Sequence, residues 1–156
     1  MIADFLARTA VWIALLAVWV SLHKPQDAGW LPTWAGITTL VGGAVLVTGL
    51  CLYVAGAVAL AHIKHAVGTP NQLIVEGPYR YVRNPVYLAM IIIIVGLSLL
   101  YQAWQVSDIV RTSFLFVMGH LAVVFLEEPA TRKRFGEAYE DYCRRVPRWL
   151  PGFRPR

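Results

Sequence analysis

Cysteine and clustered metal ligands are scarce in this chain of 156 residues, and both shortages exclude classes of protein. The only two cysteines are Cys51, inside a long apolar run, and Cys143, inside a charged one, so a disulfide framework is not supported. The chain has four histidines, His23, His62, His65 and His120. They lack the spacing of a metal site, so we expect no bound metal.

Charged residues are few as well, at 15% of the chain against 58% hydrophobic residues, and the mean hydropathy is +0.56. This composition lies well outside the soluble norm and predicts an integral membrane protein. The net charge of +5 is concentrated after Leu126, where eight of the 14 basic residues lie. A basic segment directly behind an apolar run usually faces the cytoplasm and anionic lipid. We therefore expect membrane lipids as partners, and no nucleic acid.

Four long apolar runs are present, and about 20 apolar residues suffice to cross roughly 30 Å of hydrocarbon. The sequence predicts one all-α membrane domain over residues 1–156, with four transmembrane helices at residues 5–22, 31–61, 86–104 and 109–126. We interpret the first run as a retained span and not a signal peptide, because no small-x-small cleavage site follows Leu22.

The segment at 129–146 predicts an amphipathic interfacial helix after the fourth span. Proline favours the first turn of a helix, so Pro129 and the preceding Glu127–Glu128 predict that the fourth span ends there. One face of the helix is apolar, and the other carries predicted ion pairs at i, i+4. The apolar face holds Phe135, Tyr139, Tyr142 and Val146, and the pairs are Glu128/Arg132, Glu140/Arg144 and Asp141/Arg145.

Three glycines, Gly42, Gly49 and Gly56, recur every seven residues on one stripe of the second span. Small residues at such spacing let another helix approach closely. We interpret the stripe as a helix-packing surface.

Four spans would place both termini on the cytoplasmic side, together with the polar connection at residues 66–85. The tyrosine- and arginine-rich stretch Glu76–Tyr87 would then meet Glu127 and Glu128 at one membrane face. Their carboxylates, basic groups and aromatic rings suit a ligand with both signs of charge and a flat ring. S-adenosylmethionine fits that description, and it would explain why no Ser/His/Asp, Cys/His or glycine-rich phosphate motif is present.

A purely structural interpretation stays open on these residue types. Arg80 and Arg83 would then be positive-inside anchors, the tyrosines an aromatic belt, and Glu127 and Glu128 helix-capping charges.

Residues 73–88, Leu-Ile-Val-Glu-Gly-Pro-Tyr-Arg-Tyr-Val-Arg-Asn-Pro-Val-Tyr-Leu, resemble the signature of the isoprenylcysteine carboxyl methyltransferases and the related phospholipid methyltransferases. The later segments 127–129, 135–139 and 142–147 resemble the second signature of the same family. Together they cover residues 71–151, in the family's order and spacing. The resemblance implies a small membrane enzyme that binds S-adenosylmethionine and methylates a membrane-embedded or amphiphilic small acceptor, which could be a carboxylate, an amine or a thiol.

The resemblance also implies roles for individual residues. Glu127, with Glu128 beside it, would take the amino group of the cofactor, and Arg83 would belong to the same pocket. The remaining positions that would line or floor the pocket are Asn71, Gln72, Leu73, Ile74, Tyr79, Asn84, Pro85 and Tyr87.

Two positions depart from the family pattern. Asn84 stands where the family usually has a histidine, which argues against proton transfer there. Val123 stands where the eukaryotic prenylcysteine enzymes are expected to have an arginine for the substrate carboxylate, so the acceptor is left open.

His120 lies seven residues before Glu127, on the same face of a regular helix, and is our candidate catalytic residue. An imidazole at this depth should face protein or a water-filled cavity, where it could contact substrate or accept a proton. Two rival functions remain. One is a nicotinamide-dependent membrane reductase similar to sterol reductases, and the other is a non-catalytic membrane scaffold.

Overall fold

The computed structural model describes residues 2–22, 34–66, 73–101 and 105–150. Within these ranges the chain forms helices and no strand, which confirms the all-α prediction for the described residues. The elements are α1 (Ile2–Leu22), α2 (Trp34–Ala66), η2 (Gly77–Arg80), α3 (Pro85–Leu100), α4 (Val106–Ala122), η3 (Val123–Glu127), α5 (Glu128–Phe135) and α6 (Glu137–Arg145).

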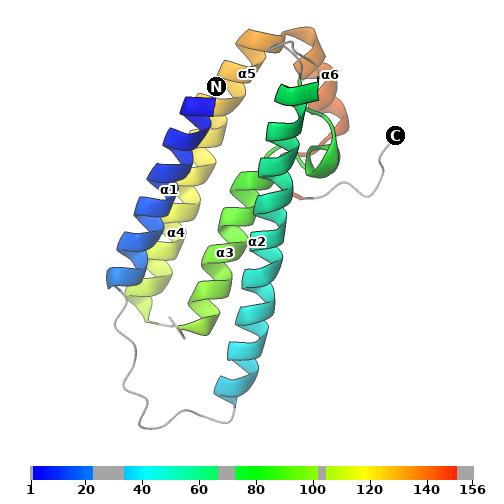
Figure 1. Cartoon of the computed structure of the whole chain (residues 1–156). Helices are drawn as coiled ribbons and strands as arrows, with labels where there is room; N and C mark the ends of the chain where they lie inside the picture. Colours follow the sequence, from blue (N-terminus) through cyan, green and yellow to red (C-terminus); the bar gives the residue numbers. More distant parts are fainter. Residues whose placement is uncertain (1, 23–33, 67–72, 102–104, 151–156) are drawn as a thin grey trace.

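The four long helices lie side by side, with α1 next to α4 and α2 next to α3 (Figure 1). The short elements η2, α5 and α6 gather at one end of the bundle, where α2 and α4 end and α3 begins (Figure 1). Residues with polar or charged side chains are therefore brought to that end from three separate parts of the sequence.

Two helical stretches among the described residues are long and apolar enough to cross a membrane, Gly36–Ala61 and Val106–Phe135. The apolar parts of the other two long helices, Ile13–Leu22 and Pro85–Leu100, are shorter. The predicted third span, 86–104, ends early as a helix because α3 stops at Leu100, and positions 102–104 lie outside the described residues. Four complete crossings stay a prediction.

Glycine determines how closely α2 and α3 pack. A β-carbon placed on Gly42 would lie 2.8 Å from the backbone nitrogen of Leu100, and one on Gly49 would lie 2.9 Å from that of Ile93. From the other side, a β-carbon on Gly96 would lie 2.6 Å from the nitrogen of Leu46. Any larger residue would push the two backbones apart. The glycine stripe of the second span is thus confirmed as a packing surface, and α3 is its partner.

A second contact region joins α1 to α3 and α4. Trp19 is 2% exposed and forms a buried cluster with Ile94 and Leu115. Its indole nitrogen donates a hydrogen bond to Thr112 Oγ1 over 3.3 Å, which satisfies the polar atom of an otherwise apolar ring. This cluster closes the bundle on the side away from α2.

The helix of the predicted fourth span does not end at Glu127–Glu128, and where the membrane span ends stays a prediction. The helix continues from α4 through the π-helical turn η3 into α5, and the backbone N–H of Glu128 bonds to the carbonyl of Val123 five residues earlier. Proline has no N–H, so Pro129 interrupts the regular ladder at this point. A wider π turn accommodates that interruption without ending the helix.

The single amphipathic helix predicted at 129–146 is wrong, because the chain turns at Gly136 between α5 and α6. Gly136 has φ +53° and ψ −127°, a conformation that side-chain-bearing residues rarely adopt. Although the helix breaks there, Tyr139, Tyr142 and Val146 still bury together, with Leu73 packed against them. The predicted apolar face therefore exists, but two segments that meet at a turn build it.

The turn changes the predicted ion pairs. Arg132 bonds to Glu140 across the turn and not to Glu128, while Arg144 bonds to Asp141. Arg145 donates to the backbone carbonyl of Asp141 over 3.3 Å. Glu128 is thereby left to partners outside α5.

Candidate functional site

The two segments expected to form the site do meet in the structure. The Tyr87 hydroxyl, in the first turn of α3, donates a hydrogen bond to Glu127 Oε1 over 2.8 Å. Beside it, Arg83 Nη1 lies 3.4 Å from Glu128 Oε1. Both acidic residues at the η3–α5 junction therefore have partners in the stretch that precedes or opens α3.

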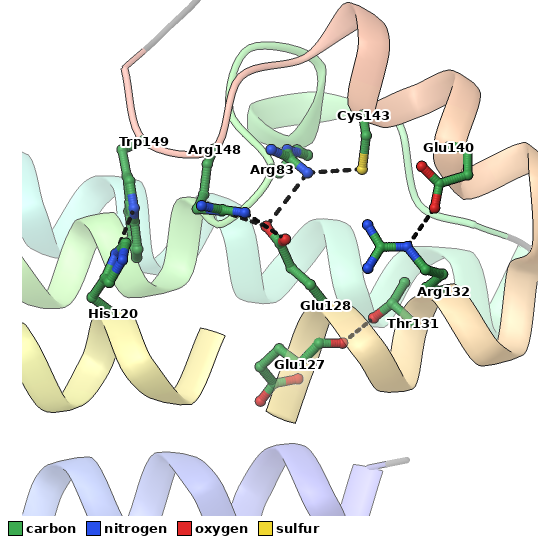
Figure 2. Close-up of polar contacts among 10 residues, drawn as sticks. All are labelled: Arg83, His120, Glu127, Glu128, Thr131, Arg132, Glu140, Cys143, Arg148 and Trp149. Atoms are coloured by element: carbon green, nitrogen blue, oxygen red, sulfur yellow. Dashed lines mark hydrogen bonds and ion pairs between the residues drawn. The ribbon is translucent and has the colours of Figure 1, made fainter. Parts of the chain in front are cut away.

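Glu128 is the centre of a buried charge cluster (Figure 2). Arg148 donates two hydrogen bonds to its carboxylate, one from Nε over 2.7 Å and one from Nη2 over 2.8 Å. The Glu128 side chain is only 5% exposed and that of Arg83 13%, so these charges are largely removed from water. Arg83 Nη1 also donates to Cys143 Sγ over 2.7 Å. Bidentate arginine–carboxylate pairs are strong and directional, so this cluster fixes how the C-terminal segment sits on α5.

Tyrosine hydroxyls supply a second set of links at the same end of the bundle. Tyr142 donates to the backbone carbonyl of Tyr79 over 2.7 Å. Burial, reinforced by the neighbouring Tyr79 and Tyr139, raises the pKa of Tyr142 above its usual range. Burial and the negative charge of Glu128 raise the pKa of Tyr139 to about 12. Both phenols are therefore protonated at neutral pH, and Tyr142 serves as a donor.

Just before α3 lie two buried hydrogen-bond donors that have no partner within the described part of the chain. Asn84 precedes the helix as its N-cap residue without a side-chain capping bond, and Pro85 behind it is fully buried. The two donors are the atoms Asn84 Nδ2 and Arg83 Nε, for which no described residue provides an acceptor. An unpaired buried donor costs roughly 1–3 kcal/mol, and such groups commonly mark a ligand contact.

An apolar cavity of about 260 Å³ lies between α3 and α4. One face of α3 and one face of α4 line it, and Ile94 and Leu115 of the buried cluster form part of its wall. Its polar end is bounded by Tyr87, the residue that bonds to Glu127. The other lining residues are Met90, Ile91, Val95, Thr112, Ser113, Phe116, Val117, Gly119 and Trp149.

His120 contacts the C-terminal segment and not Glu127. Trp149 Nε1 donates to His120 Nδ1 over 3.1 Å, and the ring centroids are 5.8 Å apart. Figure 2 shows the Glu127 carboxylate pointing away from Glu128 and from His120. The expectation that His120 and Glu127 share a face assumed a regular α-helix, and the π turn between them alters the angular relation of the two positions.

The other predicted cofactor residues fall into two groups. Asn71 and Gln72 lie outside the described residues. Leu73 packs on the Tyr139–Tyr142 cluster, Ile74 is half-buried, and Tyr79 is tied to α6 through its carbonyl. Their roles toward a cofactor stay predictions.

Arg148 and Trp149 are the site residues that the sequence analysis missed. The signal available was an arginine and a tryptophan between Pro147 and Pro151, a pattern that is equally typical of a basic tail.

Among the described residues, no group of three or more His, Cys, Asp or Glu side chains is arranged to hold a metal ion.

Comparison with known proteins identifies relatives of the chain. Two curated bacterial proteins are each 24% identical to it over 151 residues, covering 92% of this chain. They are the nickel-cobalt-cadmium resistance protein NccN of Alcaligenes xylosoxydans xylosoxydans and the cobalt-zinc-cadmium resistance protein CzcN of Cupriavidus metallidurans. The chain spans 64% and 63% of their lengths, respectively. No solved structure matches it.

Residues 37–138 match the family described as phospholipid methyltransferase. This range holds more than half of the chain, including all of α3 and α4 and both acidic residues of the site. With its two long apolar helices, the protein is a membrane protein. It belongs to the phospholipid methyltransferase family.

Proposed function

We propose that the protein transfers a methyl group from S-adenosylmethionine to an amphiphilic acceptor at the end of the bundle where α3 begins. The observation that carries the proposal is the double position of Tyr87. Its ring bounds the apolar cavity, and its hydroxyl bonds to Glu127 in the polar site. An acceptor with an apolar part in the cavity would present its polar part directly to that site.

The residues around Tyr87 fit the cofactor chemically. Glu127 offers a carboxylate for an ammonium group, and the partnerless donors Asn84 Nδ2 and Arg83 Nε suit a carboxylate or a ring nitrogen. Tyr79 and the preceding Leu73 and Ile74, with Asn71 and Gln72, would complete the enclosure as the family resemblance implies. When bound, S-adenosylmethionine supplies an activated methyl group, which an acceptor nucleophile takes while the sulfonium becomes a thioether.

The chain's own contribution is then chiefly to position the reactants. Holding two reactants in line supplies much of the rate gain of such transfers. Glu127 would orient the cofactor, the cavity would orient the acceptor, and the Glu128 cluster would hold the two halves of the site together. A proton released by an amine or thiol acceptor would pass to water. His120 Nδ1 would not take it, because that nitrogen already accepts a hydrogen bond from Trp149.

The proposed setting is a multi-pass membrane protein with its site on the cytoplasmic side. The gathering of η2, α5 and α6 at one end of the bundle supports a single polar face (Figure 1). The exposed basic residues Arg132, Lys133 and Arg134 belong to the same end, as the positive-inside rule expects.

Binding separates this proposal from its two rivals. Purified protein should bind S-adenosylmethionine or its demethylated product in a calorimetric titration and should not bind a nicotinamide cofactor. A reductase would show the reverse preference. A scaffold would bind neither.

Activity is tested by incubating membranes with methyl-labelled cofactor and identifying the labelled product. Ile91→Trp fills the cavity and should abolish labelling while leaving cofactor binding intact. The matched control is Phe114→Trp on α4, a 58% exposed position that does not line the cavity. Equal labelling by both variants would contradict the cavity as the acceptor site, and no cofactor binding by the wild type would contradict methyl transfer itself.

A further inference from the structure

The residues that follow α6, Val146–Leu150, form a C-terminal strap anchored to three other parts of the molecule. The carbonyl of Pro147 accepts a hydrogen bond from the backbone N–H of Arg83 over 2.9 Å. Arg148 donates two hydrogen bonds to Glu128 of α5, and Trp149 donates one to His120 of α4. Three consecutive residues are thus tied to the stretch before α3, to α5 and to α4, so the strap has a defined path.

Along this path the Trp149 ring lies against the cavity. Among the described residues that line the cavity, Trp149 alone comes from outside α3 and α4. Tyr87 bounds the same end of the cavity from α3. An indole has a large apolar body and one polar N–H, so it can face an apolar space while its nitrogen bonds to a neighbour. Here that neighbour is His120, with the two rings tilted by 34°.

The hydrogen bond defines the role of His120. An indole N–H only donates, so His120 Nδ1 must accept, and the neutral imidazole then carries its proton on Nε2. The bond makes His120 a candidate positioning residue for Trp149, whereas the catalytic role expected of it stays a prediction.

We propose that Trp149 is a specificity-determining residue that limits the cross-section of the acceptor at the polar end of the cavity. This inference rests on the proposed function, because it names what the acceptor site selects. In this proposal, the indole and the Tyr87 ring together would admit a slim, unbranched apolar segment and would exclude a bulky or caged group of equal carbon number.

Two probes separate cross-section from polarity and carbon number. n-Decylamine and 1-adamantylamine both have ten carbons and one amine, but the first is linear and the second is a cage. Their binding to the purified full-length chain in nanodiscs is measured by equilibrium dialysis, with empty nanodiscs as the reference for partition into lipid. Wild-type protein should favour the linear amine by about tenfold, the scale at which pocket shape discriminates apolar groups.

The variants test the proposed role of Trp149. Trp149→Ala and His120→Leu should both reduce that preference to about twofold or less, whereas Trp149→Phe should keep most of it because a ring remains. Leu150→Ala is the control, since Leu150 is 79% exposed and lies outside the cavity lining. Ile91→Trp should abolish binding of both amines and so locate the binding in the cavity.

The possible failures are distinguishable. An unchanged preference in Trp149→Ala, or no binding of either amine by the wild type, overturns the proposal for Trp149. Thermal unfolding of each variant identifies misfolding, and if Trp149→Ala does not fold, His120→Leu decides alone. A wild-type chain that shows the Trp149-dependent preference but does not bind S-adenosylmethionine overturns the proposed methyl transfer and leaves the size selection standing.

Discussion

Helix α3 has two very different neighbours. Toward α2 it packs through glycines so closely that no β-carbon fits at Gly42, Gly49 or Gly96. Toward α4 it leaves a cavity of about 260 Å³. One helix thus packs rigidly on one face and forms a wall of the cavity on the other.

The difference shows how a few helices can combine a rigid contact with an open cavity. Close backbone packing against α2 fixes the position of α3 without large side chains. The side chains on the other face are then free to line a space instead of filling it. Tyr87, which bonds to Glu127, and Trp149, which follows the Arg148 of the Glu128 cluster, line that space at its polar end. Substitutions on the two faces should therefore have opposite signatures, one on stability and the other on binding.

The largest effect is expected where the tight face is overfilled. In Gly96→Leu the added atoms would meet the backbone of Leu46, starting with a β-carbon 2.6 Å from its nitrogen. We expect a loss of more than about 3 kcal/mol in the free energy of unfolding, at the upper end for overpacking, because backbone atoms cannot move aside. Chemical unfolding in detergent, followed by circular dichroism, measures it.

The matched control is Gly43→Leu on α2, where no atom lies within 4 Å of an added β-carbon. It should stay within about 0.5 kcal/mol of wild type, as most surface substitutions do. If both variants unfold at the same denaturant concentration, the contact between α2 and α3 is not packed more rigidly than the one between α3 and α4.

How much of this contrast the sequence predicts depends on the range of the interaction. The seven-residue spacing of Gly42, Gly49 and Gly56 predicts a packing stripe because it is a local, periodic signal. An even number of spans likewise predicts that Tyr87 and Glu127 lie at the same end. Both features were confirmed, since they depend only on helix geometry and chain order.

The errors arose where one residue type fits two structures. Pro129 fits the first turn of a new helix, but it equally follows a π turn within a continuing one. The apolar period from Phe135 to Tyr142 runs straight across Gly136, so it conceals the turn there. The bond between Trp149 and His120 depends on that turn and on the Arg148–Glu128 pair, so no local pattern could reveal it.

The next largest effect on the free energy of unfolding is expected at Glu128, in the charge cluster near the polar end of the cavity. Glu128→Gln leaves the 13% exposed Arg83 charge without a carboxylate, and it replaces one of the two oxygens that accept from Arg148 with an amide donor. We expect a loss of about 3 kcal/mol, the scale for breaking a buried ion pair. The same unfolding measurement checks it. Adding Arg83→Met to this variant should recover part of the loss, because it removes the uncompensated charge.

Glu140→Gln is the matched control for the buried pair. It breaks a pair with Arg132 whose side chains are 50% and 43% exposed. Such solvent-exposed pairs contribute little to stability because water and salt screen them, so we expect a much smaller loss than at Glu128. A loss at Glu140 equal to that at Glu128 would show that burial does not distinguish the two.

Tyr87→Phe tests the link between the cavity and the polar site. It keeps the ring that bounds the cavity but removes the 2.8 Å bond to Glu127. We expect cofactor affinity to fall by about 1–2 kcal/mol, the range for losing one partner of a partly buried polar contact. Calorimetric titration measures it. Tyr81→Phe, at a 45% exposed position in the same stretch, should bind like wild type, and a wild-type affinity in Tyr87→Phe would separate Glu127 from the cofactor site.

The smallest effect compares the two faces of α3 by removing one methylene from each. Ile93 is 9% exposed and contacts the position of Gly49, whereas Ile91 lines the cavity. Ile93→Val should cost about 1 kcal/mol of unfolding free energy, because a close-packed contact loses its partner atoms. Ile91→Val should cost only a few tenths of that unit, since fewer atoms surround the group that it loses. A double-variant measurement should give the sum of the two values if the faces act independently, and a clear departure from that sum would show that packing against α2 also shapes the cavity toward α4.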